Sequence, residues 1–124
     1  MILLCDEDIG TGIPQALELV GFEAMSLAKK GWLSTPDVQW LTHAGRHAWI
    51  VLSCNKKMLE VPQERDTIVR ERVGIVFLTS GEENLPKTLR LLLGKMDWFE
   101  TIDMLVPRPF AYYLYPRGRT DKKL

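Results

Sequence analysis

Short apolar runs recur along the chain, and longer mixed segments separate them. Runs that lack apolar–polar alternation are typical of strands buried on both faces, as in parallel sheets. The segments between the runs carry apolar residues at helical spacing, often with proline near the start or glycine near the end. The pattern predicts strands at 2–5, 22–27, 49–52, 75–78 and 110–115, a turn at 79–81, and helices that begin near Pro14, Pro36, Pro62 and Leu85.

The alternation of strands and helices predicts a layered α/β domain with a mainly parallel sheet. At 124 residues the chain is long enough for one domain with its own hydrophobic core. We expect a single domain over residues 1–115, followed by a basic C-terminal tail over residues 116–124 that is frayed.

The amino-acid composition limits how the protein could bind nucleic acids or membranes. Apolar residues make up 46% of the chain, charged residues 26%, and the formal net charge is zero. A neutral chain has no overall attraction for a polyanion, so any nucleic-acid site has to be local. No apolar run approaches the ~20 residues of a membrane span, and the opening MILLCDED is too short for a signal peptide. We therefore expect a soluble, cytoplasmic protein with no membrane contact, in which Cys5 and Cys54 are reduced thiols.

Two polar runs directly follow predicted strands. The acidic run 6–8 comes after the first strand, and the polar run 53–55 comes after the third. In parallel sheets ligands bind outside the carboxyl ends of the strands, so both runs are expected at the same edge. Carboxylates this close together suit a Mg²⁺ or Mn²⁺ ion, which takes oxygen ligands and keeps several waters. The alternative is a solvated turn whose carboxylates cap a helix.

Further polar residues adjoin this edge. Asp37 lies near the start of the second helix, where it either favours the helix dipole or faces the same edge as Asp6. Asn55 stands where a further carboxylate would complete the group, and it brings no charge. The acids just downstream are interpreted as solvated helix residues rather than ligands: Glu60, Glu64 and Asp66.

Basic residues beside the edge could contact phosphates. Lys56 and Lys57 directly follow Asn55. For the cations of the C-terminal tail, a charged solvated surface is the simpler explanation. The tail cations are Arg117, Arg119, Lys122 and Lys123.

Three segments together resemble the PIN-like nuclease family over residues 1–80. The opening, LLCDEDIGTGIPQALELVGFE, resembles family members that start with Leu-Asp-x-x-Leu-Gly or Leu-Asp-Glu-Asn. The central segment, STPDVQWLTHAGRHAWIVLSCNKKM, resembles the family's Asp, its Trp-Ile pair and a following Val-Leu-Thr-x-Asp. The stretch VPQER resembles the Pro-x-Glu-x-Arg of the VapC-like toxin branch.

The resemblance implies a three-layer α/β/α Rossmann-like PIN domain and Mg²⁺- or Mn²⁺-dependent cleavage of RNA. It also implies a toxin of a toxin–antitoxin pair, with a cognate antitoxin and a homodimeric state. By position, catalysis falls to Asp6, Asp37 and Asn55, and metal binding to Asp6, Asp8 and Asp37. Ser53 and Glu7 support the site, and Ser53 keeps the hydroxyl of the family's Thr-x-Asp. Asn55 departs from the pattern, because the family carries an acid there.

Two hypotheses follow from these residues. The first is a metal-dependent endoribonuclease, which the acids Asp6, Asp8 and Asp37 favour. The second is a catalytically degenerate PIN-like domain that binds RNA or protein, which Asn55 favours. A receiver-type signalling domain also begins with an acidic pair after a strand, but it needs an acceptor Asp after the third strand, where this chain has Ser53-Cys54-Asn55.

Overall fold

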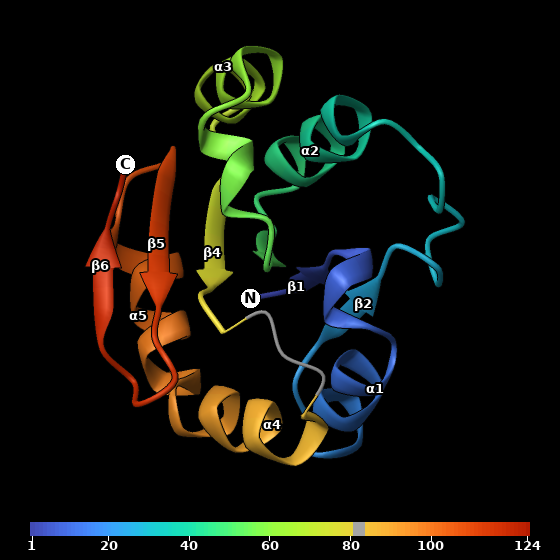
Figure 1. Ribbon diagram of the computed structural model, residues 1–124, viewed down its shortest axis with the longest axis vertical. Helices are drawn as coiled ribbons and strands as arrows, with labels where there is room; N and C mark the ends of the chain where they lie inside the picture. The colour runs from blue at the N-terminus through green and yellow to red at the C-terminus, as the bar shows by residue number, and fades with distance from the viewer. Residues whose placement is uncertain (81–83) are drawn as a thin grey trace.

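The computed structural model describes residues 1–80 and 84–124, so the last residue of the predicted turn at 79–81 lies outside the described residues. Strands and helices alternate along most of the chain (Figure 1). The strands are β1 (Leu3–Cys5), β2 (Ala24–Ser26), β3 (Ile50–Ser53), β4 (Gly74–Leu78), β5 (Phe110–Leu114) and β6 (Thr120–Lys122). The helices are α1 (Gly12–Leu19), α2 (Asp37–Arg46), α3 (Pro62–Arg70), α4 (Leu85–Gly94) and α5 (Met96–Leu105), with short 3₁₀ turns η1 (Glu7–Ile9) and η2 (Lys56–Leu59).

The strands form one six-stranded sheet in the order β2-β1-β3-β4-β5-β6. Neighbouring strands are parallel from β2 to β5, and β6 is antiparallel to β5. Every residue of β1, β3 and β4 is buried, which explains why these segments are continuously apolar apart from Gly74 and Ser53. Gly74 is required by packing, because a Cβ there would lie 2.5 Å from the ring of Phe110.

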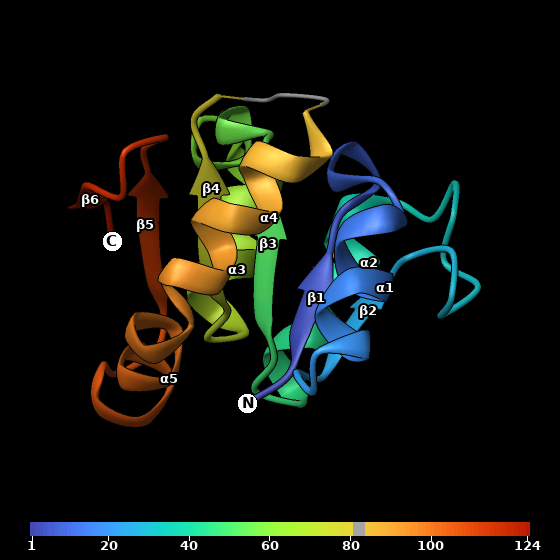
Figure 2. The same cartoon turned by 90° about the horizontal axis from the view of Figure 1, so that it is seen from below.

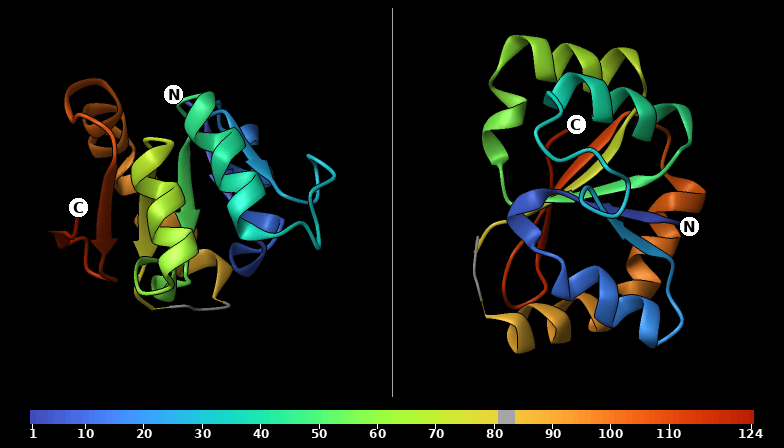
Figure 3. Two further views of the ribbon diagram at one scale, coloured as in Figure 1. Left: turned by 90° about the horizontal axis from the view of Figure 1, so that it is seen from above. Right: turned by 90° about the vertical axis from the view of Figure 1, so that its right-hand side faces the viewer.

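Helices cover both faces of the sheet and make the domain a three-layer α/β/α fold. Helices α2 and α3 lie side by side on one face, and α1, α4 and α5 lie on the other (Figures 1, 2 and 3). Each face has its own core, because successive strand residues point to opposite sides. Leu4, Val51 and Ile75 pack towards Trp40 of α2, whereas Leu3, Ile50 and Val76 belong to the core beneath α1, α4 and α5.

The strand order places a topological switch between β1 and β3. From β1 the chain crosses by α1 to β2, and from β3 it crosses by α3 on the opposite face to β4. In doubly wound sheets of this order, ligands bind outside the carboxyl ends of the two strands at the switch. Asp6 directly follows β1, and Ser53 ends β3. The fold thus brings the two polar runs that follow the first and third strands to the same point.

The C-terminal part differs from the sequence-based expectation in two ways. Helix α5, which includes Phe99 and Ile102 in the core, was not among the predicted helices. The tail is not frayed, because residues 120–122 form β6 and pair with Tyr112, Tyr113 and Leu114. The basic composition of the tail predicts a solvated end, but composition says nothing about the hydrogen-bonding groups that β5 leaves free for an extra strand. In the described part of the chain, no helix is both long and apolar enough to cross a membrane.

Candidate functional site

Asp6 is the most enclosed acid of the site. It directly follows β1, and its backbone N–H donates to the carbonyl of Leu52 in β3 at 2.9 Å. Its carboxylate accepts from the backbone N–H of Glu7 at 2.7 Å and from the hydroxyl of Ser53 at 2.8 Å. The residue is only 8% exposed. Strand pairing and two hydrogen bonds therefore hold the carboxylate in one orientation at the switch between β1 and β3.

Asp8 lies one turn further on, in η1, and is joined to the end of β3. Its Oδ1 accepts from the backbone N–H of Cys54 at 3.1 Å, and its Oδ2 lies 3.5 Å from Ser53 Oγ. The Ser53 hydroxyl also accepts from the backbone N–H of Asn55 at 3.0 Å. Ser53 is wholly buried and thus joins Asp6, Asp8 and Asn55 in one hydrogen-bonded group.

Asp37 approaches the site from the α2–α3 layer. It is the first residue of α2, and its carboxylate accepts from the indole N–H of Trp40 at 3.0 Å. Because the Trp40 ring is fully buried, this bond ties Asp37 to the core. The charge of Asp37 raises the pKa of both Asp6 and Asp8, after the larger effect of burial, so the three carboxylates share one electrostatic environment.

Glu64 also belongs to this group. It lies in the first turn of α3, beside α2, and is half-buried. Burial raises the pKa of Glu64 first, and the charge of Asp37 and a hydrogen bond with it raise the pKa further. Glu64 is therefore a partly exposed helix acid that stands beside Asp37. One sequence signal indicates that Glu64 and Asp37 are neighbours. Helices that follow parallel strands start at the carboxyl edge of the sheet, so the first turns of α2 and α3 both lie there.

Burial and like charge give the site a raised affinity for protons. Burial, followed by the charges of Asp8 and Asp37, raises the pKa of Asp6 from 3.8 to about 6, even though two hydrogen bonds act to lower it. The pKa of Asp8 is also raised, chiefly by desolvation. At neutral pH the site therefore holds carboxylates that repel one another, and a cation would relieve that repulsion.

Replacing the Asp6 carboxylate should stabilise the metal-free protein at neutral pH. Because the pKa is higher in the folded state than in the unfolded state, the folded protein binds more protons between about pH 4 and 6, and its free energy of unfolding falls as pH rises through that window. Asp6→Asn keeps an oxygen acceptor and removes the charge. We expect it to raise the free energy of unfolding by about 2 kcal/mol at pH 7.5, with a much smaller gain at pH 4.

Urea unfolding of both proteins in EDTA at the two pH values measures this difference. A variant that is destabilised equally at pH 4 and pH 7.5 would show that the Asp6 charge imposes no cost on the fold. Asp97→Asn is the matched control, because Asp97 is an exposed carboxylate in the first turn of α5.

The remaining predicted residues are less closely involved. Glu7 is exposed, and its carboxylate lies 3.4 Å from the backbone N–H of Ser34, which turns it towards the loop before α2. Lys56 and Lys57 are exposed in η2, and the Lys56 ammonium lies 5.6 Å from the ring centre of Tyr113. Both lysines therefore stand at the carboxyl edge next to Asn55, and Lys56 leans towards β5.

The thiols beside the acids are unsuited to nucleophilic chemistry. Cys5 and Cys54 are free, as expected. Burial and the nearby charges of Asp6 and Asp8 raise the pKa of Cys5 to about 12 and that of Cys54 to about 11. A thiol with so high a pKa stays protonated at neutral pH, and a protonated thiol is a poor nucleophile.

The donor set suits a hard divalent cation. Within residues 1–80 and 84–124, no group of three or more His, Cys, Asp or Glu side chains is arranged to hold a metal ion. Mg²⁺, however, is commonly bound through one or two carboxylates and completes its shell with water and substrate phosphate oxygens. Asp6 and Asp8, joined through Ser53, fit that requirement. A cavity of about 520 Å³ opens beside Asp8 and Cys54 and reaches Thr88 of α4, which leaves room for a substrate.

A doubly wound α/β/α domain of this strand order belongs to the class of open α/β proteins whose ligands bind outside the carboxyl ends of the strands. Residues 1–80 match the model of a family described as PIN-like domain, and the chain belongs to that family. The match includes all four acids of the site, Asp6, Asp8, Asp37 and Glu64. No curated protein and no solved structure shows significant similarity to the chain.

Proposed function

We propose that this protein is a metal-dependent endoribonuclease. The observation that carries the proposal is the gathering of Asp6, Asp8, Asp37 and Glu64 at the switch between β1 and β3, from three segments: the turn after β1 and the first turns of α2 and α3. Burial of Asp6 and the like charges around it raise pKa values in this group, and carboxylates with perturbed pKa values cluster at functional sites. Membership of the PIN-like family supports a nuclease.

The mechanism assigns a distinct task to each side chain. Asp6 and Asp8 bind Mg²⁺ or Mn²⁺, and Ser53 holds the Asp6 carboxylate in place by its 2.8 Å hydrogen bond. When bound, such an ion supplies a water of lowered pKa and neutralises charge that builds on the phosphate. Glu64 stands beside Asp37, where burial and the charge of Asp37 raise its pKa, and it is the acid placed to take or give a proton.

Glu64 also offers an explanation for Asn55. The family's acid is missing after β3. Helix α3, which lies beside α2, brings the carboxylate of Glu64 to the same edge, next to Asp37. We propose that Glu64 supplies part of the negative charge that Asn55 lacks. Asn55 still contributes an amide oxygen, which is a weaker ligand for a hard cation.

The biological setting proposed is that of a cytoplasmic toxin. The resemblance of residues 61–65 to the VapC-like branch supports a toxin whose activity a cognate antitoxin restrains. Such a protein would act on RNA and form a homodimer. The second candidate function, a degenerate PIN-like module that binds RNA or protein without cutting, is favoured by one observation, the uncharged side chain of Asn55.

Metal-dependent cleavage of RNA tests the proposal. Purified protein is expected to cut single-stranded or structured RNA slowly in Mn²⁺ or Mg²⁺, and excess EDTA is expected to stop the reaction. The rate should be low, because one acid of the family pattern is absent. Binding of RNA without cleavage in either metal would favour the degenerate module instead.

A further inference from the structure

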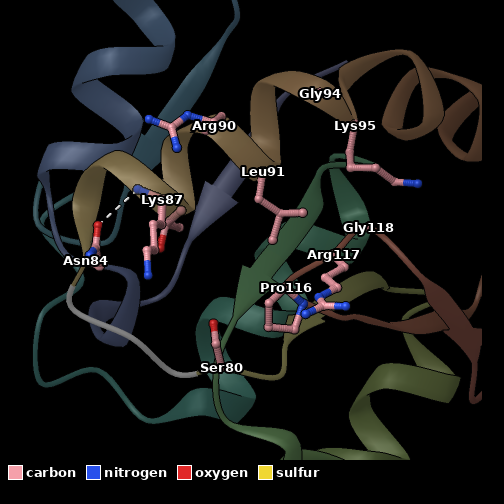
Figure 4. A pocket seen from close by; sticks show the side chains of 11 residues that line it. Ser80, Asn84, Lys87, Arg90, Leu91, Gly94, Lys95, Pro116, Arg117 and Gly118 are labelled. Carbon is pink, nitrogen blue, oxygen red and sulfur yellow. Dashed lines mark hydrogen bonds between the residues drawn. The ribbon is translucent and has the colours of Figure 1, made fainter.

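A second cavity lies away from the acids, between α4 and the turn that joins β5 to β6. Its volume is about 670 Å³, and Figure 4 shows its lining. Leu91 of α4 points into it, and Lys87 and Arg117 stand on opposite sides. The lining residues are Ser80, Asn84, Lys87, Thr88, Arg90, Leu91, Gly94, Lys95, Pro116, Arg117 and Gly118.

The described residues of this lining carry charge of one sign only. Among the described residues that line the cavity, four are cations and none is an acid. The four are Lys87, Arg90, Lys95 and Arg117. The chain has a formal net charge of zero, so it can attract a polyanion only through a local cluster of cations. The lining of this cavity provides such a cluster.

This basic cavity adjoins the candidate metal centre. Thr88 lines both the basic cavity and the cavity beside Asp8, so the two are neighbours along α4. Ser80 follows β4, and Pro116 follows β5, so both cavities open at the carboxyl edge of the sheet. Because adjacent strands lie about 4.8 Å apart, β5 is ~10 Å from β3 along that edge, within reach of a short nucleic-acid strand.

We propose that the basic cavity holds the backbone of the RNA strand beside the scissile phosphate, with Lys87 and Arg117 as its phosphate contacts. This inference rests on the proposed function and adds the path of the substrate. Leu91 and Pro116 give the cavity an apolar part against which a base or ribose can pack, and its volume is that of an ordinary small-molecule site. Substrates that extend from the acidic site towards β5 are bound more tightly than short ones.

Binding measured without metal tests this inference separately from catalysis. A fluorescently labelled short single-stranded RNA is titrated in EDTA with the wild type and with the double variant Lys87→Gln/Arg117→Gln. Both side chains are exposed, so the variant keeps the fold. The matched control is Arg46→Gln/Arg70→Gln, which removes the same charge from the last turns of α2 and α3, at the other end of the sheet.

We expect the Lys87/Arg117 variant to bind at least tenfold more weakly and the control to bind like the wild type. Between about 50 and 200 mM salt, the slope of log affinity against log salt should fall by ~1.4, since each phosphate contact in a single strand contributes about 0.7. Equal losses in the two variants, or an unchanged slope, would overturn the inference. Competition with unlabelled ligands gives a further test. If a mononucleotide displaces the labelled RNA as effectively as an oligonucleotide does, the cavity is an isolated nucleotide site and the inference is wrong.

The inference and the proposed function fail in different ways. If the wild type binds RNA through Lys87 and Arg117 but cuts it in neither Mg²⁺ nor Mn²⁺, the binding path stands and the nuclease does not. If the wild type cuts RNA and the Lys87→Gln/Arg117→Gln variant cuts it with unchanged KM, the nuclease stands and the path is wrong. If the wild type binds no RNA in EDTA, the inference that the basic cavity binds RNA is wrong. An acidic protein segment would then be the alternative ligand of its cations.

Discussion

Asp6→Ala should lower metal-dependent RNA cleavage by more than about 100-fold. Even residues that only orient a metal ligand cost 10–100-fold when they are replaced, so the loss of a ligand is expected to cost more. Asp6 is also the carboxylate that Ser53 and the Glu7 N–H hold in place, so its replacement leaves those donors without their acceptor. The measurement is the initial rate of cleavage in Mn²⁺ and in Mg²⁺ under single-turnover conditions.

Asp97→Ala is the control for Asp6→Ala, because it removes an exposed acid from the start of α5. We expect this control to cut at the wild-type rate. Cleavage that persists in the Asp6→Ala preparation, at the same rate and with the same sensitivity to EDTA, would mean that a contaminating nuclease produced the activity and that Asp6 has no part in it.

Asn55→Asp should tighten Mg²⁺ binding about tenfold and raise the rate of cleavage. The change restores the negative charge that the family pattern carries after β3, next to Ser53, whose hydroxyl accepts from the Asn55 N–H. A carboxylate attracts a divalent cation far more strongly than an amide oxygen does at the same position. Isothermal titration with Mg²⁺ and with Mn²⁺ measures the effect on binding directly.

The chain provides a matched control for Asn55→Asp in its other asparagine. Asn84 caps α4 by accepting from the Lys87 N–H at 3.0 Å, and an aspartate caps a helix equally well. Asn84→Asp therefore adds the same charge outside the acidic group and should leave the affinity for metal unchanged. If both variants bind Mg²⁺ as the wild type does, Asn55 does not face the cation.

The site residues that could be predicted from sequence are the polar residues at the ends of strands. An apolar run that stops at a polar residue marks the carboxyl end of a strand, so Asp6 and Ser53 could be placed at one edge before their hydrogen bond was seen. Glu64 could not be placed in this way. Its place beside Asp37 depends on α2 and α3 packing as neighbours. A helix acid looks the same in sequence whether it faces solvent or another carboxylate.

The C-terminal third shows the same limit for the fold. The apolar residues of α4 predict one helix through Met96, and the structure instead ends α4 at Gly94 and continues as α5. Strand β6 has the sequence Thr-Asp-Lys, which carries no apolar signal, because an edge strand that lies partly in solvent needs none. Its pairing depends on the hydrogen-bonding groups at the free edge of β5, which cannot be deduced from the sequence of residues 120–122.

The antiparallel strand at the end of the chain has a consequence for how copies of the protein meet. Without residues 120–122, β5 would present an unpaired edge of the apolar sequence Phe-Ala-Tyr-Tyr-Leu, which could template aggregation with a second chain. The strand β6 covers that edge with Asp121, Lys122 and the adjacent Lys123. Charged side chains on an outermost strand discourage further pairing, so this tail acts as a gatekeeper against open-ended growth of the sheet.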